Sequence, residues 1–326
     1  MDTSAHPTFH QGELAVQERV GVRERIAEPG ARMIRDAMPA QHREFFEKLP
    51  MIVVGSLDDQ RRPWASLLVG RPGFMQAPDD RHLHVGSPAL AGDVLASNLA
   101  AGAPLGLLGI EPHTRRRNRM NGTVERIDEQ GFIVAVDQSF GNCPQYIQAR
   151  EPSWTADPSP PMSQLLGAQL NDAARQLIRR SDMLFIASAA PHARGAAGKH
   201  GVDVSHRGGK PGFVRVDVDL ATSKVTLTLP DFRGNNMFNT LGNIAANPRA
   251  GLVFFDPGTG DVLQFTGTAE IVWDGPEVEA FTGAQRLLRV HIDESRWLAG
   301  AMPLRWSAPK YASQLDATGS WPELGA

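Results

Sequence analysis

The 326-residue sequence has little of several features that mark specialised classes of protein. It contains one cysteine, Cys143, which excludes an internal disulfide and a metal cluster held by several cysteines. No apolar run is long enough to span a membrane, and the first residues lack the basic start and apolar run of a signal peptide. We therefore expect a cytoplasmic protein with no metal site.

Excess charge and the common nucleotide-binding motifs are absent as well. A formal net charge of −3 gives no electrostatic reason to expect nucleic acid or an anionic membrane as a partner. The sequence has neither the Rossmann glycine fingerprint nor the Walker A loop, and it shows no Ser/His/Asp nucleophile pattern. Its length and its 41% hydrophobic content suit a globular protein of two domains.

An internal repeat is the strongest positive signal. Four short motifs of the first half recur in the same order in the second half: 51–54 with 183–186, 71–74 with 210–213, 98–101 with 243–246, and 122–125 with 267–270. Each half reads as short strands separated by turn residues, with one crossing helix. The repeat predicts a tandem duplication of a mainly β (α+β) domain that forms a small barrel.

The stretch 229–238 of the second repeat looks like an anion site. It joins a predicted strand at 224–228 to a predicted helix that ends at Asn247-Pro248. A helix N-terminus offers free N–H groups, and Arg233, Gly234, Asn235 and Asn236 stand just before it. These residues are expected to hold a phosphate monoester; an ordinary Asn-capped helix beside a solvated arginine is an equal alternative.

The two repeats differ at this point. The first repeat has no arginine in the matching turn, and Asp93 at its helix start would repel a phosphate. It carries instead a basic run that includes Arg115, Arg116, Arg117 and Arg119. The run is either a solvated strand edge or an anion-binding wall that faces the site of the second repeat.

With these features, the chain resembles the pyridoxamine 5'-phosphate oxidase-like, FMN-binding split-barrel superfamily, in its predicted flavin-nucleotide-binding branch. The resemblance is carried by 203–213 and by 229–248 with 251–254, and recurring pieces of that branch are also found at 9–13 and 140–147. It implies two tandem six-stranded split β-barrels with flanking helices, and FMN in the groove between the barrels. The chain lacks the C-terminal Arg-x-His pattern of true pyridoxamine phosphate oxidases, so pyridoxamine phosphate is not the expected substrate.

The resemblance also implies roles for particular residues. Ser205, Arg207 and Lys210 would approach the flavin from the first strands of the second barrel, and Gln264 would line its ring from a later hairpin. Trp64 of the first repeat would pack on the ring, although a core position is the safer interpretation. No catalytic residue is assigned, and His206 and Cys143 are weak candidates. A turn histidine explains His206 equally well, and burial is the favoured explanation for Cys143. His10 and Glu13 are expected to cover the site as a lid.

These observations define the prediction. The domains are an N-terminal helical segment (1–39), split barrel 1 with a degenerate phosphate turn (40–151), a linker (152–163), split barrel 2 with the FMN phosphate site (164–312) and a C-terminal tail (313–326). A helix is predicted from about Gln164 to Arg180. The expected function is an FMN-dependent oxidoreductase that acts on a small molecule, with NAD(P)H or a reductase as electron donor, as an internal pseudo-dimer or a homodimer. The alternatives are a carrier or sensor of flavin or haem without turnover, and reduction with a deazaflavin cofactor.

Overall fold

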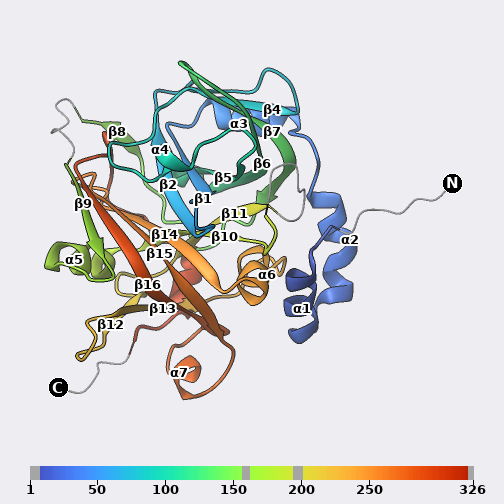
Figure 1. Ribbon diagram of the computed structural model, residues 1–326. Coiled ribbons are helices and arrows are strands. Elements are labelled where there is room, and N and C mark those ends of the chain that lie inside the picture. The colour runs from blue at the N-terminus through green and yellow to red at the C-terminus, as the bar shows by residue number, and fades with distance from the viewer. Residues whose placement is uncertain (1–7, 156–161, 194–200, 322–326) are drawn as a thin grey trace.

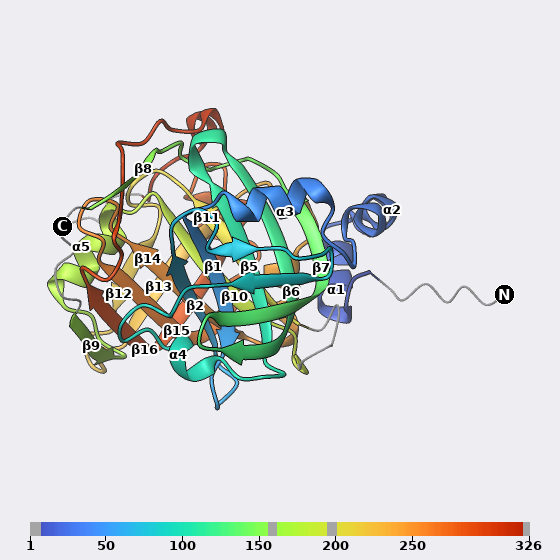
Figure 2. The same ribbon diagram turned by 90° about the horizontal axis from the view of Figure 1, so that it is seen from above.

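The computed structural model describes residues 8–155, 162–193 and 201–321. The chain folds into two β units that pack against each other, with helices at their edges (Figures 1 and 2). Among the described residues, no helix is long and apolar enough to cross a membrane.

The first sheet has seven antiparallel strands in the spatial order β2-β1-β5-β6-β7-β4-β3. They are β1 (Met51–Leu57), β2 (Pro63–Val69), β3 (Met75–Gln76), β4 (His82–Val85), β5 (Pro104–Glu111), β6 (Arg116–Asp128) and β7 (Gly131–Asn142). The second sheet repeats this order as β11-β10-β14-β15-β16-β13-β12, with β9 added on β16. They are β9 (Met162–Gly167), β10 (Met183–Ala189), β11 (Val202–Gly208), β12 (Arg215–Val218), β13 (Val225–Asp231), β14 (Arg249–Phe255), β15 (Val262–Val272) and β16 (Arg286–Ala299).

The identical strand order confirms the tandem duplication and the split-barrel fold. Even a local irregularity is duplicated: the β6–β7 register shifts at Gly122, and the β15–β16 register shifts at Gly267. A Cβ on either glycine would collide with a carbonyl oxygen of the facing strand, that of Ala135 or of His291. The sheets have seven and eight strands rather than the six expected of each, because the short strands β3 and β12 and the additional strand β9 extend them.

The helices lie around the two sheets. They are α1 (Gln11–Arg19), α2 (Arg23–Met33), α3 (Ala40–Glu47), α4 (Leu95–Asn98), α5 (Asp172–Arg180), α6 (Asn239–Ala246) and α7 (Pro276–Glu279). Short strands β8 (Pro152–Trp154) and β17 (Leu304–Trp306) pair with each other. Figure 1 shows α1 beside α6, with α2 next to α1 on the side away from α6.

Two predicted segments differ from the structure or lie partly outside it. The predicted helix from Gln164 is wrong in its first half, where residues 162–167 form β9 and pair with β16. Asn171 starts α5 later, because its side chain accepts a hydrogen bond from the backbone N–H of Ala174 at 2.8 Å. The predicted linker 152–163 begins with β8, ends in β9, and lies outside the described residues at 156–161.

Strand alternation divides the apolar side chains of each repeat between the core of its own barrel and a cluster that both repeats share. On β1, Ile52 and Val54 point into the core of the first barrel, whereas Met51 and Val53 join a cluster shared by both repeats. Strand β10 does the same: Leu184 and Ile186 face the second core, and Phe185 faces the shared cluster. Burial of each large apolar side chain stabilises the fold by about 1.5–3 kcal/mol. The shared cluster therefore fixes the two repeats against each other and defines the groove between them.

Candidate functional site

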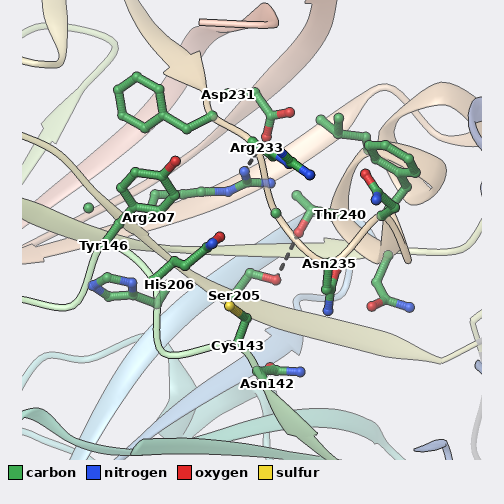
Figure 3. Close-up of a pocket in the computed structure, with 18 of the residues that line it drawn as sticks. Asn142, Cys143, Tyr146, Ser205, His206, Arg207, Asp231, Arg233, Asn235 and Thr240 are labelled. Carbon is green, nitrogen blue, oxygen red and sulfur yellow. Dashed lines mark hydrogen bonds and ion pairs between the residues drawn. The ribbon is translucent and has the colours of Figure 1, made fainter. Parts of the chain in front are cut away.

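A pocket lies where the turn of the second repeat faces the first repeat. It is lined by Arg117, Arg119, Asn142, Cys143, Gln145, Tyr146, Ser205, His206, Arg207, Gly208, Asn239, Thr240, Leu241 and most of residues 230–238. Its walls come from β6, the segment after β7, β11 and the start of α6, which are far apart in the sequence. Figure 3 shows the turn that carries Arg233 and Asn235 passing over Ser205, with Cys143 and Asn142 below.

The turn leaves the N-terminus of α6 open toward the pocket. Asn236 and Phe238 adopt left-handed backbone conformations, with φ values of 61° and 60°. Phe238 occupies the N-cap position, and no side chain caps the helix there. Asn235 accepts a hydrogen bond from Met237 N at 3.2 Å instead of capping the helix. The N–H groups of the first turn of α6 are thus available to an anion.

Ser205 and Arg119 connect the two repeats at the base of the pocket. The Arg119 guanidinium donates hydrogen bonds to Ser205 Oγ and, at 3.0 Å, to Asp203 Oδ1. Thr240, in the first turn of α6, donates to Ser205 Oγ at 2.9 Å. Ser205 is therefore held by one residue of each repeat.

A buried carboxyl group supports this base from behind. Glu13 of α1 is 4% exposed, accepts a hydrogen bond from Asn239 Nδ2 and accepts another from His10 N at 2.8 Å. Asn239 Oδ1 in turn accepts from Arg119 at 3.1 Å. Burial, followed by the negative charge of Asp203, raises the pKa of Glu13 to about 8. Glu13 thus keeps its proton at neutral pH.

Helix α1 reaches this position because two glycines let it approach α6. A Cβ on Gly242 would meet the Cα of Glu13 at 2.6 Å. A Cβ on Gly12 would collide with the carbonyl oxygen of Gly242. His10 caps α1 and pairs its Nε2 with Asn243 Oδ1 at 2.8 Å. His10 and Glu13 therefore pack behind the pocket wall and do not cover its mouth as a lid.

The structure brings most of the predicted site residues together. Ser205, His206, Arg207, Arg233, Gly234, Asn235 and Asn236 of the second repeat share the pocket with Arg117, Arg119 and Cys143 of the first. Arg207 is ion-paired with Asp231, whose other oxygen lies 3.3 Å from Arg286. Burial, followed by the charges of Arg117 and Arg207, lowers the pKa of His206 well below its ordinary value.

Three other predicted residues lie outside the pocket. Lys210 donates to Thr318 O at 2.7 Å, because the turn at 209–213 directs it toward the C-terminal segment. Gln264 is fully buried and donates to Ala65 O and to Ser66 Oγ, both at 3.0 Å. Trp64 is fully buried and donates through its ring N–H to Asp58 at 3.0 Å, so it occupies a core position.

The basic run divides according to strand alternation. Arg117 and Arg119 of β6 line the pocket, whereas Arg116 points to the opposite face, over the Phe45 ring at 4.7 Å. Arg115 precedes the strand with φ 55° and donates to Ile147 O at 3.0 Å. Arg115 and Arg116 are therefore not part of the wall that the sequence predicts.

The sequence did not single out several residues of the site. Glu13 was assigned to a lid, and Asp203, Asn239, Thr240 and Tyr146 received no role. The difference between the repeats was the available signal. Asn239 and Thr240 begin the helix that follows Arg233 in the second repeat, and the matching turn of the first repeat has no arginine. Tyr146 stacks on Phe232, with ring centroids 5.1 Å apart, a contact between separate segments that no local pattern reveals.

The donor set fits a flavin mononucleotide. The open helix N-terminus, the exposed Arg233 and the hydroxyls of Ser205 and Thr240 suit a dianionic phosphate. Nothing lies within 4 Å of a Cβ built on Gly234, so the turn has free space on that side. Fold and pocket together define a tandem split-barrel protein with an arginine-lined pocket between its repeats.

Comparisons with known proteins agree with this class. The family model for Pyridoxamine 5'-phosphate oxidase matches residues 170–302, which cover most of the second barrel. This match and the duplicated strand order confirm the resemblance to the pyridoxamine 5'-phosphate oxidase-like split-barrel superfamily. No curated protein matches the chain.

Three solved structures are similar to part of this chain. HupZ of Group A Streptococcus is 18% identical, with 39% of this chain and 92% of that chain covered and a TM-score of 0.30. HutZ, the heme storage protein of Vibrio cholerae, is 11% identical, with 41% and 97% covered and a TM-score of 0.27. A pyridoxamine 5'-phosphate oxidase-related, FMN binding protein of Nostoc punctiforme is 12% identical, with 45% and 100% covered and a TM-score of 0.25. At these identities none of them says what this chain binds.

Proposed function

We propose that the chain is an FMN-dependent oxidoreductase with one flavin site, formed by the phosphate turn of the second repeat and a wall from the first. The observation that carries the proposal is the uncapped N-terminus of α6 beside Arg233 and opposite Ser205 and Arg119. When bound, the flavin would supply hydride or electron transfer.

The chain's own residues would bind and orient the cofactor. Arg233, Asn235 and the first turn of α6 would hold the phosphate, and Ser205 would be kept in place by Arg119 and Thr240. Arg207 is held by Asp231 beside the pocket, where its charge favours an anion. Because His206 is held neutral, it can accept or donate a hydrogen bond but is not a cationic acid at neutral pH.

The second candidate is a carrier or sensor that binds flavin or haem without turnover. Haem binding by an imidazole would need an accessible ring nitrogen. His206 is the pocket's histidine in the described part of the chain; its Nδ1 is bonded to Arg117 at 3.1 Å, and its Nε2 is buried. This arrangement favours flavin over haem.

The visible spectrum of the purified protein, with chromatography of the group that heat releases, tests the cofactor. Flavin bands and released FMN are expected, and a colourless protein that does not take up added FMN would overturn the proposal. A Soret band would favour the haem carrier. Anaerobic reduction of the bound flavin by NADH or NADPH would support the enzyme; a flavin that neither nucleotide nor a reductase reduces would support the carrier.

A homodimer is not needed to complete the site, and we propose the pseudo-dimer as the functional unit.

A further inference from the structure

The arginines of the pocket differ in whether a carboxylate neutralises them. Arg119 pairs with Asp203 at 3.0 Å, and Arg207 pairs with Asp231. Arg233 is exposed at the mouth, where solvent or a phosphate can neutralise it. Arg117 has no carboxylate within ion-pair distance among the residues that the structure describes. It is therefore an arginine of this group that is only partly exposed and that pairs with no carboxylate among the described residues.

The contacts of Arg117 hold it in place without neutralising it. Its Nη1 donates to His206 Nδ1 at 3.1 Å, and its Nε is buried without a hydrogen-bond partner. Because a guanidinium can only donate, the proton of His206 is on Nε2 and the ring is neutral. His206 is 6% exposed and packs edge-on against Phe185, so it is a fixed support for the arginine.

An unpaired cation in such a place is costly unless an anion joins it. An uncompensated charge that loses part of its hydration is destabilising, and the neighbouring charges of Arg119 and Arg207 add repulsion. Burial, followed by Arg119, lowers the pKa of Arg117 to about 10, which still leaves the group protonated at neutral pH. Among the described residues, the Cys143 thiol is the neighbour whose ionised form would favour the charge of Arg117. The site is therefore suited to a further negative group.

Arg117 and the phosphate turn lie on different walls of the pocket, because Arg117 is on β6 and the turn joins β13 to α6. Figure 3 shows His206, to which Arg117 is bonded, and Tyr146 on the side of the pocket opposite Asn235. Cys143 and Asn142 line the floor between the two sides. One pocket thus offers two separate positions for anions.

We propose that Arg117 binds the anionic group of the substrate, a carboxylate or a phosphate, at the His206 side of the pocket. The inference rests on the proposed flavin function: the first anion position holds the cofactor phosphate and the second selects a negatively charged substrate. Arg117 is then a specificity-determining residue, and His206 positions it.

The test compares Arg117→Gln with Arg116→Gln, its neighbour on the opposite face of β6. Acetate and inorganic phosphate serve as probes and are titrated into FMN-loaded protein and followed by calorimetry and by the flavin spectrum. In Arg117→Gln, probe binding should weaken at least tenfold while FMN affinity changes less than threefold; Arg116→Gln should change neither. A preference for acetate or for phosphate identifies the substrate group as a carboxylate or a phosphate.

Two results would overturn the inference. Unchanged probe binding in Arg117→Gln would show that Arg117 is not the anion position. A loss of FMN affinity of tenfold or more, or a lowered flavin midpoint potential with normal probe binding, would assign Arg117 to the cofactor.

Stability provides a second measurement that does not need flavin. Because Arg117→Gln removes an uncompensated charge, the melting temperature of the variant without added anions should equal or exceed that of the wild type. Acetate or phosphate should raise the melting temperature of the wild type more than that of the variant. A large fall in melting temperature would make Arg117 structural and contradict the proposal. If the wild type does not bind FMN, the proposed function fails, whereas the same titration of flavin-free protein still decides whether Arg117 binds anions.

Discussion

The two repeats place equivalent residues at two pseudo-symmetric positions, and in the described part of the chain the position in the second repeat opens into the pocket. Ser66 on β2 corresponds to Ser205 on β11, and Gln264 on β15 corresponds to Arg119 on β6. In both positions the residue from the opposite repeat donates to the serine hydroxyl: Arg119 to Ser205, and Gln264 to Ser66. The same framework therefore exists twice.

The difference lies in what occupies the start of the crossing helix. In the first repeat Asp93 accepts from Ser66 Oγ at 2.6 Å and from Leu95 N at 2.8 Å, at the start of α4. Its buried carboxyl stands where the second repeat leaves an open turn and an uncapped helix. In the first repeat a side-chain carboxyl of the chain itself occupies this position, whereas in the second repeat the position is open, as the proposed flavin site requires.

The largest expected effect comes from removing the ligand contacts of the open site. In Arg233→Ala with Asn235→Ala, FMN affinity should fall about 100-fold or more, because hydrogen bonds to a charged group contribute about 1.5–3 kcal/mol each. Fluorescence quenching of FMN on titration with protein measures the affinity. Arg296→Ala is the matched control, because Arg296 lies near Glu294 and Trp64 on the side of the position that Asp93 occupies. This variant should bind FMN as the wild type does. Retained affinity in the double variant would refute our placement of the phosphate.

The second effect concerns the support that α1 gives to the open site. Since the pKa of Glu13 is raised from 4.5 to about 8, the folded protein keeps a proton that the unfolded chain releases in this window. The free energy of unfolding should therefore fall as pH rises from about 4.5 to 8 and level off above, by about 1.4 kcal/mol for each unit of pKa shift. Glu13→Gln, which imitates the protonated form, should remove this slope.

Urea denaturation of the wild type and of Glu13→Gln at intervals between pH 5 and 9 measures this difference. Glu18→Gln, on the exposed face of the same helix, is the control and should keep the slope. Parallel pH profiles for the wild type and Glu13→Gln would show that the buried carboxyl is already ionised in the folded protein.

A smaller effect is expected at the position in the first repeat that Asp93 occupies. Asp93→Ala should lower the free energy of unfolding by about 1–3 kcal/mol, because α4 loses its N-terminal acceptor and Ser66 loses a partner. FMN affinity and stoichiometry should not change, since Asp93 lies outside the pocket. Thermal or urea unfolding measures the change in the free energy of unfolding, and flavin titration measures the affinity and stoichiometry of FMN binding. A second FMN bound by Asp93→Ala would mean that this carboxyl alone had closed the first site.

The smallest effect separates the pocket from its surroundings. Lys210→Ala should change FMN affinity less than threefold, because Lys210 bonds to Thr318 O and does not line the pocket. Arg207→Ala, three residues earlier and inside the pocket, is the comparison and should weaken binding more. If Lys210→Ala has the larger effect on the equilibrium titration, the flavin extends beyond the pocket toward the C-terminal segment.

The sequence was sufficient for the repeat, the fold and the turn that precedes α6, because these depend on local patterns. Strand alternation and turn residues recur in both halves, and Arg233 with its neighbours precedes a helix that ends at Asn247 as expected. The alternation of β6 could also have been used to separate Arg117 and Arg119 from Arg116.

The remaining contacts depend on tertiary packing that no spacing encodes. The contact of Glu13 with Asn239 joins residues 226 positions apart, and it depends on the close approach of Gly12 and Gly242. Gln264 lies outside the pocket because it forms a hydrogen bond with Ser66 of the other repeat. Lys210 lies outside the pocket because it donates a hydrogen bond to Thr318 O of the C-terminal segment. Each of these is decided by a partner on another element.

The most direct test of the account is the number of FMN molecules bound per chain. Titration of the flavin-free protein with FMN, with the end point taken from flavin absorbance against protein concentration, should give one. Two equivalents would contradict the asymmetry between the filled and the open site, and none would contradict the flavin site itself.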